Sequence, residues 1–140
     1  MELDTALDFA RSRHQGVLTT LKRDGRPQLS NIAYAVAGDG TIRISVTDDR
    51  AKTNNLRRDP RASLHVARDD FYAYCVIEAD VEIMPITTTP DDATSDALVE
   101  YYRAVAGEHD DWDDYRKAMI DEGRTILVLS PTHAYGMLPS

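Results

Sequence analysis

The sequence predicts a mainly β protein of the α+β class: an antiparallel β-barrel with helices on its periphery. Strand-like segments in the first half follow one another through tight turns, so neighbouring strands should run antiparallel. The helical segments do not alternate with the strands, which disfavours a doubly wound parallel sheet. The length of 140 residues and the hydrophobic fraction of 42% suit one core, so residues 1–140 are expected to form a single domain.

The first half of the chain reads as one helix followed by a meander of three strands. Apolar side chains recur on one side of residues 2–13, which predicts an amphipathic helix that Gly16 ends. Asp24 and Gly25 form a dipeptide that is a strong signal for a tight turn between strands. The three antiparallel strands are expected at residues 17–21, 27–36 and 41–46.

A short helix and two more strands are expected in the middle of the chain. Asp48 or Asp49 can cap this helix, and Pro60 prevents it from continuing. Alternating apolar and polar side chains then predict a strand at 62–67 and a long strand at 72–83.

The last third of the chain is expected to add two helices and two strands. Thr89 is a capping residue, and Pro90 suits the first position of a helix that ends at Gly107. A second helix is expected at 111–122. Two short strands, at 125–129 and 133–137, complete the predicted set.

Charge and composition exclude several classes of protein. The formal net charge of −8 argues against general nucleic-acid binding, which requires a broad basic surface. No run of about 18 apolar residues is present, so no membrane-spanning helix is expected. The N-terminus lacks an apolar signal core, and Cys75 is the only cysteine, so a reducing, cytoplasmic location is expected.

Residues 50–61 concentrate positive charge in this acidic chain. They contain five of its 16 Lys and Arg residues, and they coincide with the short helix between two strands. Backbone N–H groups at the start of a helix, together with cationic side chains, can hold a phosphate group. The alternative is a solvated helix face that binds nothing.

The chemistry of common catalytic and metal sites is missing from the sequence. The four histidines are scattered and do not have the spacing of metal ligands. There is no phosphate loop, dinucleotide fingerprint or nucleophile elbow. The acidic cluster at 108–114 is expected to be the first turn of a helix. We therefore name no catalytic residue and no metal ligand, and we expect a cofactor to carry the chemistry of any enzyme activity.

Three parts of the chain together resemble a known family. Residues 24–31, residues 50–63, and the pair 107–116 and 133–136 are similar to the pyridoxamine 5′-phosphate oxidase-like (PNPOx-like) split β-barrel proteins, which include FMN-binding members. Within that family they resemble the B group of flavin/deazaflavin oxidoreductases, which use coenzyme F420. The resemblance implies a six-stranded split barrel that forms a homodimer with cofactor sites at the interface.

The resemblance also implies roles for individual residues. Arg50 and Lys52 match the family's phosphate contacts and would pair with the phosphodiester of the coenzyme. On the second strand, it implies polar contacts near the ring from Gln28, Ser30 and Asn31. On the third strand, the backbone would run along the ring at Ile44, Ser45 and Val46. At the helix start, Thr53 and Asn55 would add hydrogen bonds. For the three on the second strand, an exposed strand face is the alternative.

Several further residues are weaker candidates. Four of them would lie on the substrate side of the pocket, with core or interface packing as the alternative: Tyr72, Tyr74, His133 and Tyr135. Three arginines could bind the anionic polyglutamate tail of the coenzyme or be solvated: Arg57, Arg58 and Arg61.

The implied function is reduction of a conjugated small molecule, such as a quinone, an enone or a tetrapyrrole, with reduced F420 as the hydride donor. One alternative is an FMN enzyme of the pyridoxamine 5′-phosphate oxidase type. Its typical members have basic residues near the C-terminus, whereas residues 132–140 contain no Arg or Lys. The other alternative is a non-catalytic protein that binds or stores F420 or binds haem, but a lone histidine such as His65 is too weak a signal to indicate a haem ligand.

Overall fold

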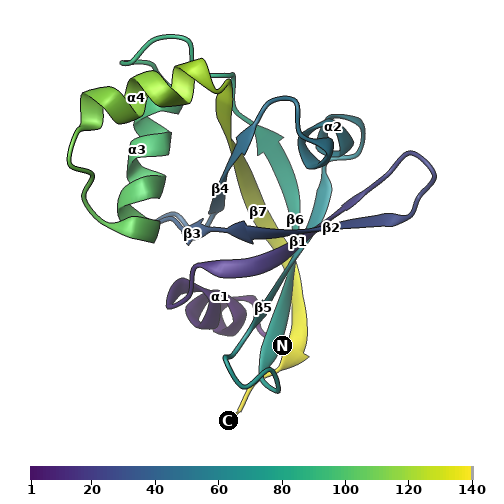
Figure 1. Ribbon diagram of the computed structural model, residues 1–140. Coiled ribbons are helices and arrows are strands. Elements are labelled where there is room, and N and C mark those ends of the chain that lie inside the picture. Colours follow the sequence, from purple (N-terminus) through teal and green to yellow (C-terminus); the bar gives the residue numbers. More distant parts are fainter. Residues whose placement is uncertain (140) are drawn as a thin grey trace.

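The computed structural model describes residues 1–139 and confirms the α+β class (Figure 1). It contains one curled antiparallel sheet with four helices around it. The strands are β1 (Gln15–Leu21), β2 (Pro27–Ala33), β3 (Ala35–Val36), β4 (Ile42–Thr47), β5 (Arg61–Ala67), β6 (Tyr74–Ile83) and β7 (Arg124–Met137), and the helices are α1 (Leu3–Arg11), α2 (Ala51–Arg58), α3 (Ala93–Ala106) and α4 (Trp112–Asp121). The strand order is β2-β1-β5-β6-β7-β4-β3. None of the described helices has the length and apolar character needed to cross a membrane.

The core fills the inside of the curled sheet. Alternate residues of each strand point inward, as the period of two predicts, and Ile44, Leu64 and Ile77 are almost completely buried. Helix α1 closes one end of the barrel with Ala6 and Ala10, which have no exposed surface. A second apolar cluster lies between α3, α4 and the outer side of β7. The two late helices therefore cover one part of the sheet and leave the rest of its outer face open (Figure 1).

The predicted strand at 27–36 is divided in the structure. It breaks at Tyr34, whose side chain is fully buried and whose hydroxyl donates a hydrogen bond to the Ala10 carbonyl at 2.7 Å. The backbone N–H of Tyr34 bonds the carbonyl of His14 at the start of β1, and the chain then turns to pair with β4. This break makes seven strands where the family resemblance implied six, and it places β2 and β3 at opposite edges of the sheet.

The predicted strands at 125–129 and 133–137 are one continuous strand, β7. It pairs with β4 through its first half and with β6 along most of its length. A bulge at Thr132 shifts the register between Glu78 and Ala79, and it accommodates Pro131, which has no N–H to donate. The break predicted from the polar and proline residues is therefore a bulge within a strand.

Three helix boundaries differ from their predictions. Helix α2 begins after Arg50, and no side chain caps it, because Asp48 is used in an ion pair with Arg57. Helix α3 begins after Asp92 rather than at Thr89. Gly16 lies inside β1 and does not end the first helix. A Cβ atom there would come within 2.8 Å of the His65 carbonyl oxygen of β5, which explains a glycine at this position.

Asp92 anchors the entry to α3 and should make stability depend on pH. Burial raises the pKa of its carboxyl group, but hydrogen bonds from the N–H groups of Thr88, Ser95 and Thr89 and from the Thr87 hydroxyl outweigh this effect and lower the pKa to about 2. Because this pKa lies below the usual value of 3.8, the ionised Asp92 carboxylate stabilises the fold at pH values above 3.8. This contribution to stability is lost as pH falls towards 2.

We expect Asp92→Asn to lower the free energy of unfolding by about 1–3 kcal/mol at pH 7, because the Asn NH2 cannot accept the hydrogen bonds that one Asp92 oxygen accepts from the N–H groups of Thr88 and Thr89. The difference between the variant and the wild type should shrink as pH falls from 5 to 2. Urea unfolding at several pH values measures it. A difference that is constant over this range would contradict the role of the ionised carboxylate.

Candidate functional site

One edge of β4 is open at the place where the barrel is split. On one side β4 pairs with β7 from Ile42 to Thr47, but on the other side it pairs with β3 only at Ile42 and Arg43. Residues 44–47 therefore have an edge with no strand partner within residues 1–139. Ile44 and Val46 point into the core and are 1% and 2% exposed, so they can meet a ligand only through their backbone. An open strand edge offers backbone N–H and C=O groups to the polar rim of a flat ring.

Tyr101 of α3 bridges the split and was not among the residues predicted from the sequence. Its hydroxyl donates a hydrogen bond to the Ala33 carbonyl at the end of β2, at 3.0 Å. The backbone of Ser45 in β4 donates to the same phenol oxygen. Burial raises the pKa of Tyr101, and the Ser45 hydrogen bond and the charge of Arg124 offset part of this rise. The phenol thus links the two sides of the split and covers one end of the open edge.

Three cationic side chains gather where β4 leads into α2. Arg50 precedes the first turn of α2 and donates through Nε to Thr47 Oγ1 at 3.1 Å. Arg124 opens β7 and lies opposite Thr47 in the β4–β7 pair. Burial lowers the pKa of Lys52, and the charges of Arg50 and Arg124 lower it further. Glu122 pairs with Arg124 at 3.1 Å and neutralises only one of the three cations.

This excess of positive charge is what an anion-binding site requires. The lowered pKa of Lys52 means that burial, and then the nearby like charges, disfavour its ammonium form, and a bound anion would offset this cost. A cavity of about 480 Å³ lies beside Arg50, lined by Thr47, Asp49, Arg50, Ala51 and Glu122. Its two carboxylates offset part of the positive charge on this side. Arg124 was missed from the sequence because it is far from residues 50–61 in the chain. Only the pairing of β7 with β4 brings it there, so no local pattern in the sequence could have found it.

Two predicted contacts at the start of α2 are instead used within the fold. The Thr53 hydroxyl is buried and donates to the Thr47 carbonyl at 3.0 Å. Asn55 is 7% exposed and donates through Nδ2 to Thr20 and to Gln28. Ser30 lies opposite Leu18 of β1, on the inner side of β2 with Gln28. Of the residues predicted to bind the cofactor, the structure places Ser45, Arg50 and Lys52 at one end of the open edge.

Asn31, Tyr74, His133 and Tyr135 lie on the outer face of the sheet. Tyr135 lies in one cross-strand row with Asn31 and His65, and His133 lies opposite Glu78 in the next row. Tyr74 stacks on His65 at 5.3 Å between ring centroids. Tyr72 was expected to begin the long strand but lies in the loop before β6 and is 78% exposed. This face is separated by the sheet from the inward-facing residues of the barrel.

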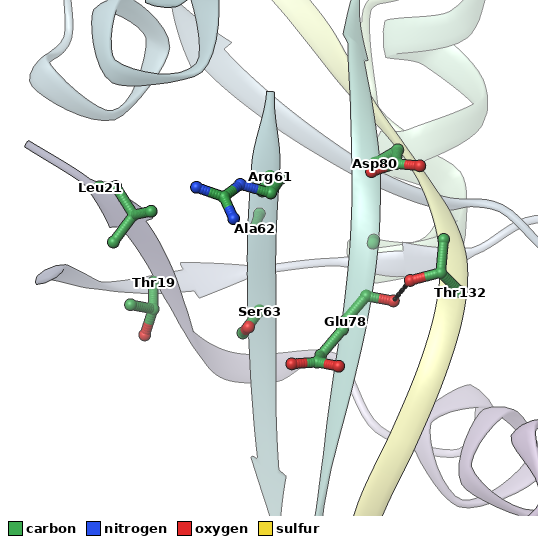
Figure 2. Close-up of a pocket in the computed structure, with 9 residues that line it drawn as sticks. Thr19, Leu21, Arg61, Ala62, Ser63, Glu78, Asp80 and Thr132 are labelled. Atoms are coloured by element: carbon green, nitrogen blue, oxygen red, sulfur yellow. Dashed lines mark hydrogen bonds between the residues drawn. The ribbon is translucent and has the colours of Figure 1, made fainter. Parts of the chain in front are cut away.

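A shallow cavity of about 370 Å³ on the same outer face contains Arg61 (Figure 2). Thr19, Ser63 and Glu78 line it together with the arginine. The Arg61 guanidinium pairs with Asp59 at 2.8 Å, so its charge is compensated locally. Among residues 1–139, no group of three or more His, Cys, Asp or Glu side chains is placed to hold a metal ion.

Comparison with known proteins identifies relatives of this chain. A model of the pyridoxamine 5′-phosphate oxidase family matches residues 3–138. A conserved hypothetical protein of Mycobacterium tuberculosis is 25% identical, with a TM-score of 0.76 over 100% of this chain and 90% of that one. An F420 reductase is 24% identical, with a TM-score of 0.69 over 91% of this chain and 94% of the reductase. A haem-binding protein of Mycobacterium smegmatis is 25% identical, with a TM-score of 0.67 over 96% of this chain and 53% of that protein.

Proposed function

The chain belongs to the pyridoxamine 5′-phosphate oxidase family, and we propose that it is an oxidoreductase that uses reduced F420 to reduce a conjugated small-molecule acceptor. The observation that carries this proposal is the group of cations Arg50, Lys52 and Arg124 beside the open edge of β4. A coenzyme with a flat ring and a phosphate needs these two features next to each other. Quinones, enones and tetrapyrroles remain the proposed classes of acceptor.

The residues at this site fit such a coenzyme. Arg50 and Lys52 would bind the phosphodiester, with charge-assisted hydrogen bonds that are among the stronger polar contacts in proteins. The backbone of residues 44–47 would hold the polar rim of the ring, and Ser45 offers a hydroxyl beside it. When bound, the deazaflavin supplies a hydride to the acceptor. The protein's part is to orient the two partners and to exclude water, and Tyr101 and α3 cover the split.

FMN is the alternative cofactor, because the same cations would bind its phosphate. Two observations favour F420. Residues 132–140 contain no Arg or Lys, unlike the C-terminal region that the family resemblance implies for FMN oxidases. The similarity to an F420 reductase spans 91% of this chain.

A side-by-side titration with F420 and FMN tests the proposal. We expect F420 to bind at least 10-fold more tightly than FMN, and reduced F420 to be oxidised when a quinone or an enone is added. Fluorescence anisotropy of each coenzyme measures its affinity, and the absorbance of oxidised F420 measures turnover. Preference for FMN would assign the chain to the flavin enzymes. F420 binding without turnover of any acceptor would favour a storage protein.

We also propose that two copies of the chain associate through the outer face of the sheet. This face carries large apolar side chains that are exposed in the single chain, including Leu29 (62%), Tyr135 (47%) and Met137 (67%). Phe71 and Tyr72, in the loop before β6, add 74% and 78% exposed aromatic rings. Such a concentration of apolar surface is typical of an interface rather than of a solvated sheet.

Changing this face should dissociate the dimer. We expect Leu29→Glu combined with Met137→Glu to shift the protein from dimer to monomer at about 10 μM, because both carboxylates would be buried in the interface without partners. Thr5→Glu combined with Ala104→Glu is the control, since both residues are exposed on helices outside the sheet and the added charge is the same. Light scattering after size exclusion measures the mass. A monomeric wild-type protein would contradict the proposed dimer.

A further inference from the structure

A separate cavity, the α1 cavity, lies where α1 leads into β1. It has a volume of about 600 Å³. Residues 12–15 form one side of it, and Ala33, Ala67 and Val105 contribute from the ends of β2, β5 and α3. None of these residues is among those proposed above to bind the coenzyme.

The α1 cavity is remote from the cations at the start of α2. Figure 1 shows α1 and α2 at opposite ends of the barrel. Gln15 begins β1 beside the cavity, whereas Leu21 ends β1 beside α2, where its carbonyl accepts a hydrogen bond from Arg58. Six steps along a strand span about 20 Å, so a ligand in the α1 cavity occupies a different site from a phosphate held by Arg50 and Lys52.

Arg13 brings a positive charge to this cavity, and most of its hydrogen-bonding capacity is unused. Its side chain is 27% exposed, and its Nε atom is buried without a hydrogen-bond partner. Nη1 makes two long bonds, to the Ala67 carbonyl at 3.4 Å and to Asp69 at 3.2 Å, and no acceptor within residues 1–139 takes a hydrogen bond from Nη2. Buried polar groups are normally paired, so this guanidinium lacks an acceptor.

The charge of Arg13 is also poorly compensated. Asp69 is the only acidic residue that lines the cavity, and its side chain is fully exposed, so the ion pair between them contributes little. The guanidinium carbon lies 5.0 Å from the centre of the Phe9 ring. An aromatic ring can hold a cation in place without neutralising it, so the charge of Arg13 remains available to a ligand.

His14 adds a second polar group to the wall. Its Nδ1 atom lies 3.0 Å from the Tyr34 carbonyl oxygen. A carbonyl oxygen only accepts hydrogen bonds, so Nδ1 carries a proton and donates it. In the neutral ring Nε2 is then an acceptor, and it makes no hydrogen bond within the part of the chain that the structure describes.

We propose that the α1 cavity binds a small oxyanion that carries a hydroxyl group, of which hydrogen phosphate is the simplest example. Nε and Nη2 of Arg13 form the edge of the guanidinium that binds an oxyanion through two parallel hydrogen bonds. Turning this edge into the cavity costs only the two long bonds of Nη1. The hydroxyl of the ligand would donate to Nε2 of His14. The inference is independent of the coenzyme, so a failure of F420 to bind would not affect it.

Titration of the ¹⁵N-labelled protein with sodium phosphate at constant ionic strength tests the proposal. In the wild type, the Nε–H resonance of Arg13 should shift until it saturates, together with the backbone amides of Gln15 and Ala67. Shifts confined to the chain around Arg50 and Lys52 would place phosphate only at the start of α2 and would overturn the proposal.

Arg13→Gln should weaken phosphate binding, followed at the Gln15 and Ala67 amides, at least about 10-fold, the scale of a lost charge-assisted hydrogen bond. Arg11→Gln is the matched control, because Arg11 is an arginine of α1 that pairs with Asp8 at 2.7 Å and the change in net charge is the same. It should bind phosphate as the wild type does. Equal affinities of Arg13→Gln and the wild type would overturn the proposal.

Two further measurements separate binding from structural effects. Arg13→Lys keeps the charge without the two-pronged edge, so it should bind phosphate more tightly than Arg13→Gln and less tightly than the wild type. If Arg13→Gln does not fold, Arg13→Lys and the Arg13 resonance of the wild type decide. Sulfate has no hydroxyl at pH 7.5 and should bind more weakly than phosphate, and equal affinities for the two anions would overturn the pairing with His14.

Discussion

Lys52→Ala is expected to weaken binding of the coenzyme by about 1–3 kcal/mol, or about 5- to 150-fold, the range of a charge-assisted hydrogen bond. The loss should be accompanied by an unchanged or higher free energy of unfolding without ligand. Burial and the charges of Arg50 and Arg124 already disfavour the ammonium in the folded protein, so removing it relieves repulsion. A variant that binds less tightly and is no less stable identifies a residue kept for a ligand.

Arg50→Ala should weaken binding by a similar amount, since both side chains would contact the same phosphate. Lys117→Ala, on the exposed face of α4, is the matched control and should bind normally. Coenzyme anisotropy gives the affinities, and urea unfolding gives the stabilities. Normal affinity in both Lys52→Ala and Arg50→Ala would remove the anion site from the start of α2.

Gly136→Ala is expected to lower the free energy of unfolding by about 2–4 kcal/mol, the range of overpacking combined with backbone strain. Gly136 lies near the end of β7 opposite Cys75, with φ of 149°, a conformation that residues with a side chain rarely adopt. An added Cβ would lie 2.3 Å from the Tyr74 carbonyl oxygen and 2.7 Å from the Cys75 Cα. Both atoms belong to the backbone of β6, so neither can rotate away.

Gly38→Ala is the matched control, because a Cβ there meets no atom within 4 Å and φ is not positive. Its stability should differ from that of the wild type by less than about 0.5 kcal/mol. Thermal unfolding compares the two variants. Equal stability of Gly136→Ala and the wild type would show that the end of β7 moves away from β6 at little cost.

The sequence predicted the elements that are built from local patterns. Alternation of apolar and polar residues located β4, β5 and β6, and the Asp24-Gly25 turn located the hairpin of β1 and β2. It could not predict the break at Tyr34, because that break depends on a hydrogen bond to Ala10 and on pairing with two distant strands. The single strand β7 was missed because a bulge and a strand end share the same polar and proline residues.

The site was predictable where it depends on neighbours in sequence and not where it depends on packing. Arg50 and Lys52 lie close together along the chain, so their charges could be recognised as one group. Arg124 and Tyr101 join the site only through the pairing of β7 with β4 and the position of α3. Thr53 was predicted as a cofactor contact because of the family resemblance and its place at the helix start, but its hydroxyl is used to hold α2 to the end of β4.

The central place of β7 in the sheet has a consequence for synthesis of the protein on the ribosome. Strands β2, β1, β5 and β6 can pair as soon as residue 83 has emerged, but β4 and β3 join them only through β7. Until residues 124–137 are available, β4 keeps an apolar inner side and an unpaired edge, features that favour aggregation of nascent chains. Folding of the barrel should therefore be completed late, in one step, when β7 inserts between β6 and β4.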